Sequence, residues 1–457
     1  MNLSLKFEIK NFLSKFAIFI IVMVWLGTFF NNKRYKSERL IDNDIISYYA
    51  YLPAVFMEHD LSLKFLDDHT KPHPGKYWPE TAPNGGRVIK TTMGLAVMYL
   101  PFFALGHVVA NISGEPLTGY SQPYYFFLCF GTLIYSFIGL TVLRKLLLKW
   151  FTDGITALTL LCVYLGTNLF HYTIFEPLMS HAYIIFLTVL FLKFTIQWHE
   201  NPSYKNSLLL GVVSGLMILT RPLTALFLIV FLFYNAHSIK SLREKSRFVI
   251  GHAGQFVSIF FMILLLFAPQ MIYWNATTGQ WLFNSYQNER FYFSNPHLPE
   301  ALIGFRKGWL LYTPVMCFAV AGLFFLRKNN AGFSLSLPLC VIINIYFLSC
   351  WWAWWFGGSF GNRGYIDMYV LLSVPMAGCF TLLWGEKNWR RISVTSVAIL
   401  LVCYQLFQTA QYHYGAINFH GMTREAYWET FLRLKPTHRF WEVLKEPDYE
   451  KAKKGME

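Results

Sequence analysis

Long runs of apolar residues, separated by short polar connections, extend over most of the chain. A helix that crosses the hydrocarbon core of a bilayer needs about 20 predominantly apolar residues. We therefore predict an all-α polytopic membrane protein with about 11 transmembrane helices. The predicted spans lie near residues 16–30, 123–143, 155–175, 179–197, 207–220, 222–236, 249–273, 308–326, 332–351, 366–384 and 393–410.

Lysine and arginine are concentrated in every second connection between these runs. They follow the second, fourth, sixth, eighth and tenth runs, most densely at residues 144–149 and 240–247. Cytoplasmic loops carry such an excess, so the pattern predicts a cytoplasmic N-terminus and a C-terminal segment, 411–457, on the outer side. No small-residue cleavage site follows the first run, which we interpret as an uncleaved span.

Two segments allow a second interpretation. Residues 207–236 could form one long helix, but Arg221 and Pro222 lie at its centre. An arginine at mid-depth costs about 2.5–3.5 kcal/mol, which favours two short spans that meet at the outer surface.

Residues 88–112 are apolar enough to cross the membrane, yet a span there would move the basic segment 144–149 to the outer side. We predict interfacial helices for 88–112, kinked at Pro101, within a first outer loop of about residues 31–121.

The composition agrees with this class. Hydrophobic residues make up 55% of the 457 residues and charged residues only 14%, which excludes a disordered chain and disfavours a soluble enzyme. The net charge of +14 indicates membrane topology and anionic lipid rather than nucleic acid. Residues 1–410 form one predicted membrane domain with a second outer loop at 275–307, and 411–457 form an outer tail with a partly amphipathic helix.

The first outer loop holds the first candidate groups. Asp42 and Asp44 follow the first span by about a dozen residues, before an apolar-aromatic stretch that would hold them near the interface. A carboxylate there can act as a base toward a hydroxyl or bind a divalent metal, although an ordinary helix N-cap explains one of the two equally well. Lys90, with Arg87 nearby, could clamp the phosphate of a lipid-linked substrate or contact lipid headgroups.

Three further clusters fall on the same predicted side. His171, Glu176 and His181 flank the turn between the third and fourth spans, and Arg221 lies at the hairpin tip. Ionisable groups at membrane depth are candidates for function by default. The segment 351–369 combines four tryptophans, four glycines and the single cation Arg363, and indicates either a tight turn in an aromatic belt or a sugar-stacking platform.

All of these candidate groups are predicted to lie on the outer side of the membrane, and this is the main indication of function. The outer face of a bacterial-type membrane has no ATP or nucleotide sugar, so a donor used there must carry its energy in the membrane. A sugar on a polyprenyl phosphate meets this need, and carboxylates and cations would serve as base and phosphate ligands. A transporter or lipid flippase is the rival class, but the spans are nearly free of charge and show no internal repeat.

Four motifs resemble those of the type C glycosyltransferases (the GT-C superfamily), notably the protein O-mannosyltransferases and the aminoarabinose transferases of lipid A. DNDIISYYAYLPA resembles their acidic motif followed by an aromatic, and KTTMGLAVMYLPFFALGH their lysine-bearing segment. FEPLMSHAY is similar to their acid-proline turn, and WFGGSFGNRGYIDMY to their glycine-rich arginine element. The resemblance implies a GT-C-type fold with interfacial helices in a long first periplasmic loop.

The resemblance also implies roles for individual residues. Asp44 would be the general base, although the Asp-Asn-Asp sequence leaves Asp42 as an alternative. Glu176 would act near the acceptor or, with Asp44, hold Mg²⁺ or Mn²⁺ if a divalent ion is used. The implied substrate-binding residues are Lys90, Arg87, Arg221, Arg363, His171, His181 and Tyr48.

The expected function is that of an inverting glycosyltransferase in the bacterial cytoplasmic membrane. It would move a sugar from a polyprenyl-phosphate-linked donor to an acceptor hydroxyl on a glycolipid, glycan or protein at the outer face. The alternative within enzymes is transfer of a whole lipid-linked glycan or a phospho-group to protein. The motifs leave open whether a divalent ion, Mg²⁺ or Mn²⁺, takes part.

Overall fold

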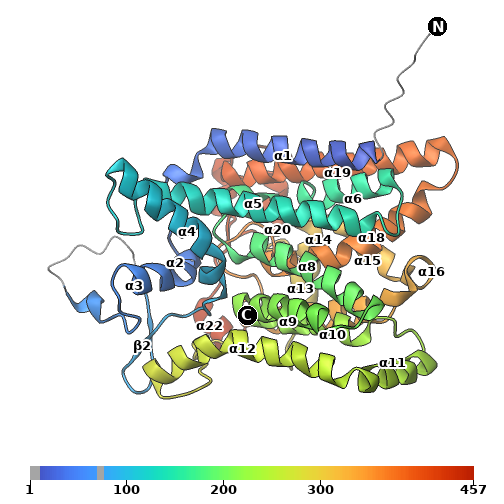
Figure 1. Ribbon diagram of the computed structural model, residues 1–457. Coiled ribbons are helices and arrows are strands. Elements are labelled where there is room, and N and C mark those ends of the chain that lie inside the picture. Colours follow the sequence, from blue (N-terminus) through green and yellow to red (C-terminus); the bar gives the residue numbers. More distant parts are fainter. Residues whose placement is uncertain (1–10, 69–76) are drawn as a thin grey trace, which may run out of the picture.

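The computed structural model of the protein describes residues 11–68 and 77–457. In Figure 1 the long helices α1 (Phe12–Asn32), α5 (Gln122–Leu147), α12 (Ala253–Thr278) and α19 (Asn388–His413) run in roughly the same direction, with α1 at the top of the bundle and α12 at the bottom. Segments of the first loop lie at one end of this bundle, at left in Figure 1, and will be called the loop end. This arrangement is that of an all-α polytopic membrane protein, as predicted.

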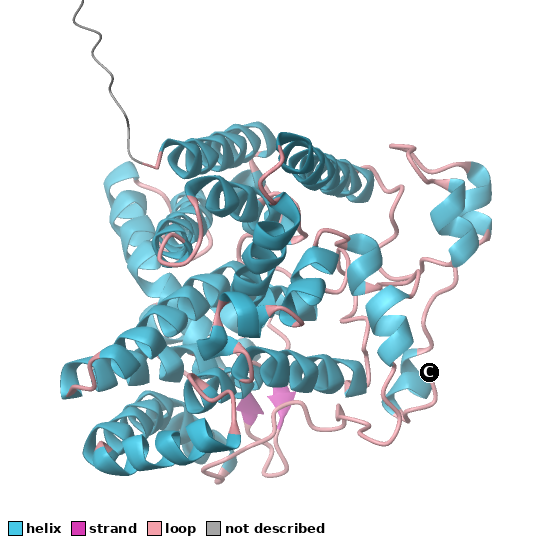
Figure 2. Cartoon of the chain, turned by 90° about the vertical axis from the view of Figure 1, so that its right-hand side faces the viewer, coloured by secondary structure: helices cyan, strands magenta, loops and turns pink. Residues whose placement is uncertain are grey.

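The remaining elements are short helices, further membrane-length helices and one pair of strands. Before α12 they are η1 (Arg34–Lys36), α2 (Asp44–Tyr49), α3 (Tyr51–Phe56), η2 (Lys64–Asp67), β1 (Glu80–Thr81), β2 (Arg87–Val88), α4 (Gly94–Ser113), α6 (Asp153–Tyr164), α7 (Leu169–Ile174), α8 (Ser180–Glu200), α9 (Tyr204–Thr220), η3 (Pro222–Phe227), α10 (Leu228–Phe233) and α11 (Ile239–Gly251). After α12 they are α13 (Leu298–Ile303), α14 (Trp309–Tyr312), α15 (Met316–Leu323), α16 (Leu326–Asn329), η4 (Ala331–Phe333), α17 (Ser336–Cys350), η5 (Arg363–Met368), α18 (Tyr369–Trp384), α20 (Arg424–Glu429), α21 (His438–Glu442) and α22 (Tyr449–Lys453). The strands pair antiparallel, Glu80 with Val88 and Thr81 with Arg87, at the edge of the bundle (Figure 2).

Eight helices in the described ranges are long and apolar enough to cross a bilayer. Seven of them coincide with predicted spans, and the eighth is α4. The other four predicted spans are shorter or broken: α6 with α7, α9, η3 with α10, and α14 with α15. Pro314 lies in the break between α14 and α15, where its missing N–H cannot continue a helix.

The predicted interruption at Arg221 is confirmed. α9 ends at Thr220, Arg221 has an extended backbone, and η3 begins at Pro222. The glycines of α9 pack closely against α12, as their spacing predicts, because a Cβ on Gly211 would lie 2.8 Å from the Ile259 carbonyl oxygen.

α4 differs from the prediction for residues 88–112. It is one continuous helix through Pro101, rather than several helices separated by a kink. It lies against the first half of α5, since the Tyr135 hydroxyl donates to the Met98 carbonyl and a Cβ on Gly106 would meet Tyr124. Its contacts with α5 therefore stay near the loop end of the bundle (Figure 1).

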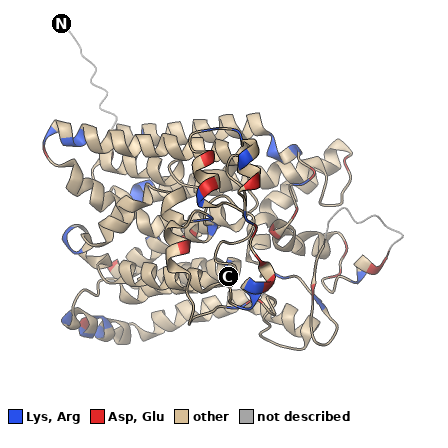
Figure 3. Ribbon diagram, turned by 180° about the vertical axis from the view of Figure 1, so that it is seen from behind, with Lys and Arg blue, Asp and Glu red and all other residues tan. Residues whose placement is uncertain are grey.

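Charged residues gather mainly at the two ends of the bundle and over the C-terminal helices (Figure 3). The basic helix α11 and the short helix α16 lie at the end opposite the loop end, where α1 begins (Figure 1). These are the segments that the sequence analysis assigned to the cytoplasmic side. Which end faces the cytoplasm stays a prediction.

Candidate active site

Asp44 and Arg363 form an ion pair at the loop end. Asp44 is the first residue of α2, and its Oδ2 lies 2.6 Å from Nη2 of Arg363. Asn43 before it has φ 51° and ψ −134°, a backbone conformation that few residues other than glycine adopt. The N–H of Asn43 donates to Asp42 Oδ1 at 2.9 Å, which leaves Asp42 free of an ion pair within the described chain.

A glycine-rich turn presents Arg363 to Asp44. Gly357 and Gly361 have positive φ values of 65° and 60°, which favour glycine strongly. A Cβ on Gly361 would also lie 3.3 Å from the side chains of Asn168 and Tyr312. The turn can therefore pass close to α7 and α14 before η5 begins at Arg363.

Asp42, Asp44, Glu176 and Arg363 line one cavity of about 440 Å³. They come from the start of α2, the turn between α7 and α8, and the start of η5. Four candidates of the sequence analysis therefore lie around one cavity: Asp42, Asp44, Glu176 and Arg363. The cavity is also lined by Arg34, Arg39, Asn43, Ile45, Trp78, Met179, Gly357, Gly358, Tyr412, Phe419, His420 and Tyr449.

The buried side chain of His171 lies next to Glu176, on the side away from the cavity. Nε2 of His171 lies 3.6 Å from its Oε1, and neither ring nitrogen of the buried His171 has a hydrogen-bond partner. His171 is enclosed by the rings of Tyr172, Phe175, Phe360 and Tyr412. It therefore supports Glu176 from the protein interior, rather than lining the cavity as a substrate ligand.

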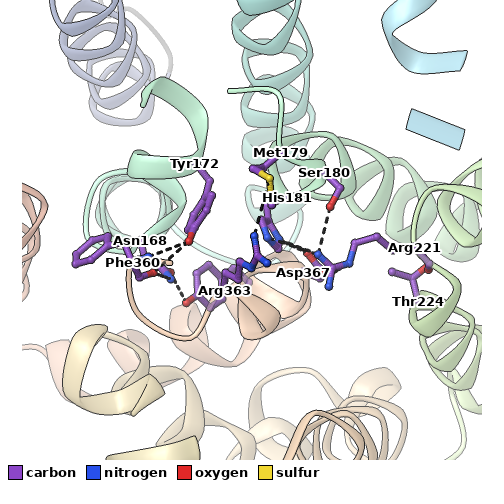
Figure 4. A network of polar contacts seen from close by, with 11 residues as sticks. Asn168, Tyr172, Met179, Ser180, His181, Arg221, Thr224, Phe360, Arg363 and Asp367 are labelled. Atoms are coloured by element: carbon purple, nitrogen blue, oxygen red, sulfur yellow. Dashed lines mark hydrogen bonds and ion pairs between the residues drawn. The ribbon is translucent and has the colours of Figure 1, made fainter. Parts of the chain in front are cut away.

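Arg221 and His181 belong to a second network beside the first (Figure 4). Arg221 Nε lies 2.9 Å from Asp367 Oδ2, and His181 Nδ1 lies 3.0 Å from Asp367 Oδ1. The Arg221 guanidinium also donates to Ser180 Oγ at 3.2 Å. Figure 4 shows Arg363 between this group and the contacts of Tyr172 with Phe360. Neither Arg221 nor His181 lines the cavity, contrary to the expectation that both contact substrate.

Tyr48 lies between these two networks. It is buried in α2, within electrostatic range of Arg221, Asp44 and Arg363. Burial raises the pKa of Tyr48, against the opposing effect of the two arginines, so its hydroxyl keeps its proton. Asp367 was not singled out in the sequence, although it stands four residues after Arg363 in the same motif.

Lys90 and Arg87 lie outside the cavity. Lys90 Nζ is 2.5 Å from Glu289 Oε1 and 3.4 Å from Glu80 Oε1. Burial alone would lower the pKa of Lys90, but the hydrogen bond and charge of Glu289, together with Glu80, raise it. Arg87 pairs with Asp67 at 2.6 Å. Sequence position gave no indication of these partners, because Glu289 is 199 residues away.

The C-terminal segment forms part of the cavity wall, which the sequence analysis did not anticipate. Phe419, His420 and Tyr449 line the cavity from the segment treated as an outer tail. Lys307 holds this wall in place, since its buried ammonium group donates to the carbonyls of Ser359 and Phe419. Burial holds the pKa of Lys307 well below its usual value.

The tryptophans of 351–355 do not form an exposed platform. Trp352, Trp354 and Trp355 are buried. The rings of Trp352 and Trp355 meet Tyr449 edge-on, with centroids 6.1 and 5.6 Å away. They support the C-terminal wall from beneath, and Trp78 is the tryptophan that reaches the cavity.

Comparison with solved structures finds proteins of similar fold, one of which is an archaeal enzyme. No protein-family model matches the chain, and no curated protein matches it. The chain is similar to the crystal structure of the Archaeoglobus fulgidus oligosaccharyltransferase in the apo form, with 14% sequence identity and a TM-score of 0.50. The match covers 94% of this chain but 58% of the archaeal chain. The chain therefore shares an all-α membrane fold with this enzyme. The likeness at this identity concerns the fold alone, and it does not single out the O-mannosyltransferases or the aminoarabinose transferases.

The carboxylates of the cavity do not fit a divalent metal as they are arranged. Hard cations such as Mg²⁺ take several oxygen ligands at short distance. Within residues 11–68 and 77–457, no three His, Cys, Asp or Glu side chains gather into a ligand set. Asp44 is also paired with Arg363, and Glu176 with His171. No step proposed below passes through a metal.

The Glu176–His171 pair predicts how the stability of the folded protein depends on pH. Burial alone would raise the pKa of Glu176, but His171, Arg363 and Arg34 together hold it below its usual value. The ionised carboxylate therefore stabilises the folded protein above the ordinary pKa of a glutamate, and this contribution is lost as pH falls through the lowered value. We expect Glu176→Gln to lower the thermal midpoint of the detergent-solubilised protein at pH 7, with a difference from wild type that shrinks toward pH 4.

The matched control is Glu446→Gln, which removes an exposed carboxylate that pairs with His420 at 3.4 Å. It should leave the midpoint unchanged at pH 7. A Glu176→Gln deficit that stays constant from pH 7 to pH 4 would show that the ionised carboxylate is not the stabilising group.

Proposed function

We propose that the protein is an inverting glycosyltransferase that uses a polyprenyl-phosphate-linked sugar as donor and an acceptor hydroxyl at the outer face of a bacterial cytoplasmic membrane. The loop end would then face the periplasm, with the N-terminus in the cytoplasm and the C-terminal wall outside. The observation that carries the proposal is the convergence of Asp42, Asp44, Glu176 and Arg363 in one cavity of a fold shared with an oligosaccharyltransferase.

The chemistry needs a base and a stabiliser of negative charge. The acceptor oxygen forms the new bond to the anomeric carbon while the bond from that carbon to the phosphate oxygen breaks, with inversion. The acceptor proton passes to Asp44 or Asp42, and polyprenyl phosphate leaves with the bonding electron pair. Arg363 lies in the same cavity and can stabilise that charge, provided that substrate loosens its pair with Asp44.

Glu176 supports the proposal as a second acceptor-side group. It lies in the same cavity, and its carboxylate stays ionised at neutral pH, since its pKa is lowered. An ionised carboxylate accepts hydrogen bonds and can orient an acceptor hydroxyl toward the base.

The test is mass spectrometry of surface glycolipids and glycoproteins from cells with and without the chain. We expect loss of one sugar from a defined glycan, restored by the wild-type chain and not by Asp44→Asn. Unchanged glycans in the strain that lacks the chain would contradict the proposal.

Transfer of a whole lipid-linked glycan to protein is the second candidate. The observation that favours it is the fold shared with an oligosaccharyltransferase, although the chain spans about 58% of that enzyme. The two candidates give different products. A single-sugar mass difference supports the first, and loss of a complete glycan from protein supports the second.

A further inference from the structure

Two arginines of the cavity wall, Arg34 and Arg39, form no ion pair with a residue in the part of the chain that the structure describes. Arg34 lies in η1, directly after α1, and Arg39 lies five residues later. Arg34 donates to Ser37 Oγ and to the Arg39 carbonyl, both at 3.0 Å, and its Nε is buried without a partner. Within residues 11–68 and 77–457, the side chain of Arg39 makes no hydrogen bond, although its carbonyl accepts from Arg34.

The cations that the sequence analysis did propose as substrate ligands are all paired with carboxylates. Each has a carboxylate oxygen within 3 Å, and three of the four lie outside the cavity. The pairs are Arg87 with Asp67, Lys90 with Glu289, Arg221 with Asp367, and Arg363 with Asp44. The free positive charge of the cavity therefore belongs to Arg34 and Arg39.

An anion is the ligand that this arrangement favours. A buried donor without a hydrogen-bond partner is costly, and Arg34 Nε is such a donor, so the guanidinium is not fully satisfied by its contacts with Ser37 and the Arg39 carbonyl. Guanidinium groups present several donors in a planar fork that matches the oxygens of phosphate. Glu176 lies within electrostatic range of Arg34 but is 3.6 Å from His171, its ion-pair partner.

The position of the pair indicates where that anion comes from. η1 follows α1, whose apolar sequence is long enough to span the membrane, so Arg34 stands where the chain leaves the hydrocarbon. The turn is fixed there by Gln122, which donates to the Tyr35 carbonyl at 2.7 Å, and by the packing of Tyr35 on Phe29 and Phe126. Lipid phosphates lie at this depth, beside the exit of a spanning helix.

We propose that Arg34 and Arg39 form a phosphate-binding site on the wall of the cavity, and that the phosphate is carried by a lipid. The assignment to the donor's leaving phosphate rests on the proposed function. The site itself does not, because a phosphate-bearing lipid would bind there whether or not a sugar is transferred.

The test measures binding of farnesyl phosphate to the purified full chain in detergent, with farnesol and inorganic phosphate as comparison ligands. We expect farnesyl phosphate to bind, and Arg39→Gln and Arg34→Gln/Arg39→Gln to weaken it by about tenfold or more. Arg39→Gln is included because it should not disturb folding: the described chain accepts no hydrogen bond from the Arg39 side chain, and the Arg39 carbonyl that accepts from Arg34 is unchanged. Lys36→Gln is the matched control, an exposed cation of the same turn that does not line the cavity.

The possible outcomes distinguish a lipid-borne phosphate from free phosphate, and they distinguish failure of the phosphate site from failure of the transferase proposal. Binding of farnesyl phosphate well above that of inorganic phosphate supports a lipid-borne ligand, whereas equal binding of the two contradicts it. Equal binding of farnesol and farnesyl phosphate, or the same loss in Lys36→Gln as in Arg39→Gln, overturns the phosphate site. Asp44→Asn should retain farnesyl phosphate binding even if it abolishes transfer, so failure of the transferase proposal leaves this measurement intact.

Discussion

Replacing Asp44 by asparagine is expected to lower kcat for sugar transfer by about 10²–10⁴-fold, the usual contribution of a positioned general base. The substitution keeps the size of the side chain and removes its charge. The measurement is transfer from a short-chain polyprenyl-phosphate sugar to a membrane extract, in the detergent-solubilised protein. Asp42→Asn is the matched comparison, because Asp42 lines the same cavity without an ion pair. A larger loss for Asp42→Asn would assign the base to Asp42, and a loss below about tenfold in both variants would contradict a carboxylate base.

A double-mutant cycle with Arg363 separates catalysis from positioning. Asp44 also holds Arg363 at 2.6 Å, so its loss could act through the arginine alone. If so, Asp44→Asn/Arg363→Gln should lose no more activity than either single variant. If Asp44 takes the proton and Arg363 acts separately on the leaving phosphate, the two losses should multiply. The pH–rate profile of Arg363→Gln gives a further readout. If Asp44 is the base, this variant should still lose activity at low pH, where the base becomes protonated.

Replacing Asp367 by asparagine is expected to destabilise the fold by about 3–5 kcal/mol, the range for removing one partner of a buried ion pair. Asp367 is 6% exposed, and its two oxygens pair with Arg221 and His181. Asparagine leaves the Arg221 charge without a counter-charge in a site with little water. The free energy of unfolding, measured by denaturant titration in mixed micelles, checks this expectation.

The combined variant Arg221→Met/Asp367→Leu distinguishes an unpaired charge from lost packing. Replacing both partners of a buried pair by apolar residues is often neutral or stabilising, so this variant should be more stable than Asp367→Asn. Glu244→Gln removes one partner of an exposed pair, with Lys240 at 4.0 Å, and should show no measurable change. Equal destabilisation of the combined variant and Asp367→Asn would indicate that shape, rather than charge, sets the cost.

Much of the site could be proposed from sequence because its groups stand next to recognisable local features. Asp44 follows an apolar run, Glu176 precedes a proline between two runs, and Arg363 follows a cluster of glycines. Each of these is an ionisable residue where the chain turns at a membrane surface. The same reasoning failed for Lys90, because an isolated lysine in sequence gave no indication of Glu289 and Glu80.

Arg34 and Arg39 were passed over for a related reason. Basic residues after a first span are ordinary flanking residues, and nothing nearby in sequence marks them as free of partners. Their lack of a carboxylate is a property of the folded chain, as is the return of Tyr449 to the cavity from a segment that looked like a surface tail.

The sequence by itself determined the class of the protein, the positions of most apolar helices and the break between Thr220 and Pro222. These features depend on the hydrophobicity and backbone preference of neighbouring residues, which are local quantities. Only the tertiary structure decided which charges meet. Asp44 pairs with Arg363 across 319 residues and Arg221 pairs with Asp367, while Arg34 and Arg39 form no ion pair with a described residue. Ion pairs require atoms within about 4 Å, and which side chains come that close is fixed by how the helices pack, not by the order of residues along the chain.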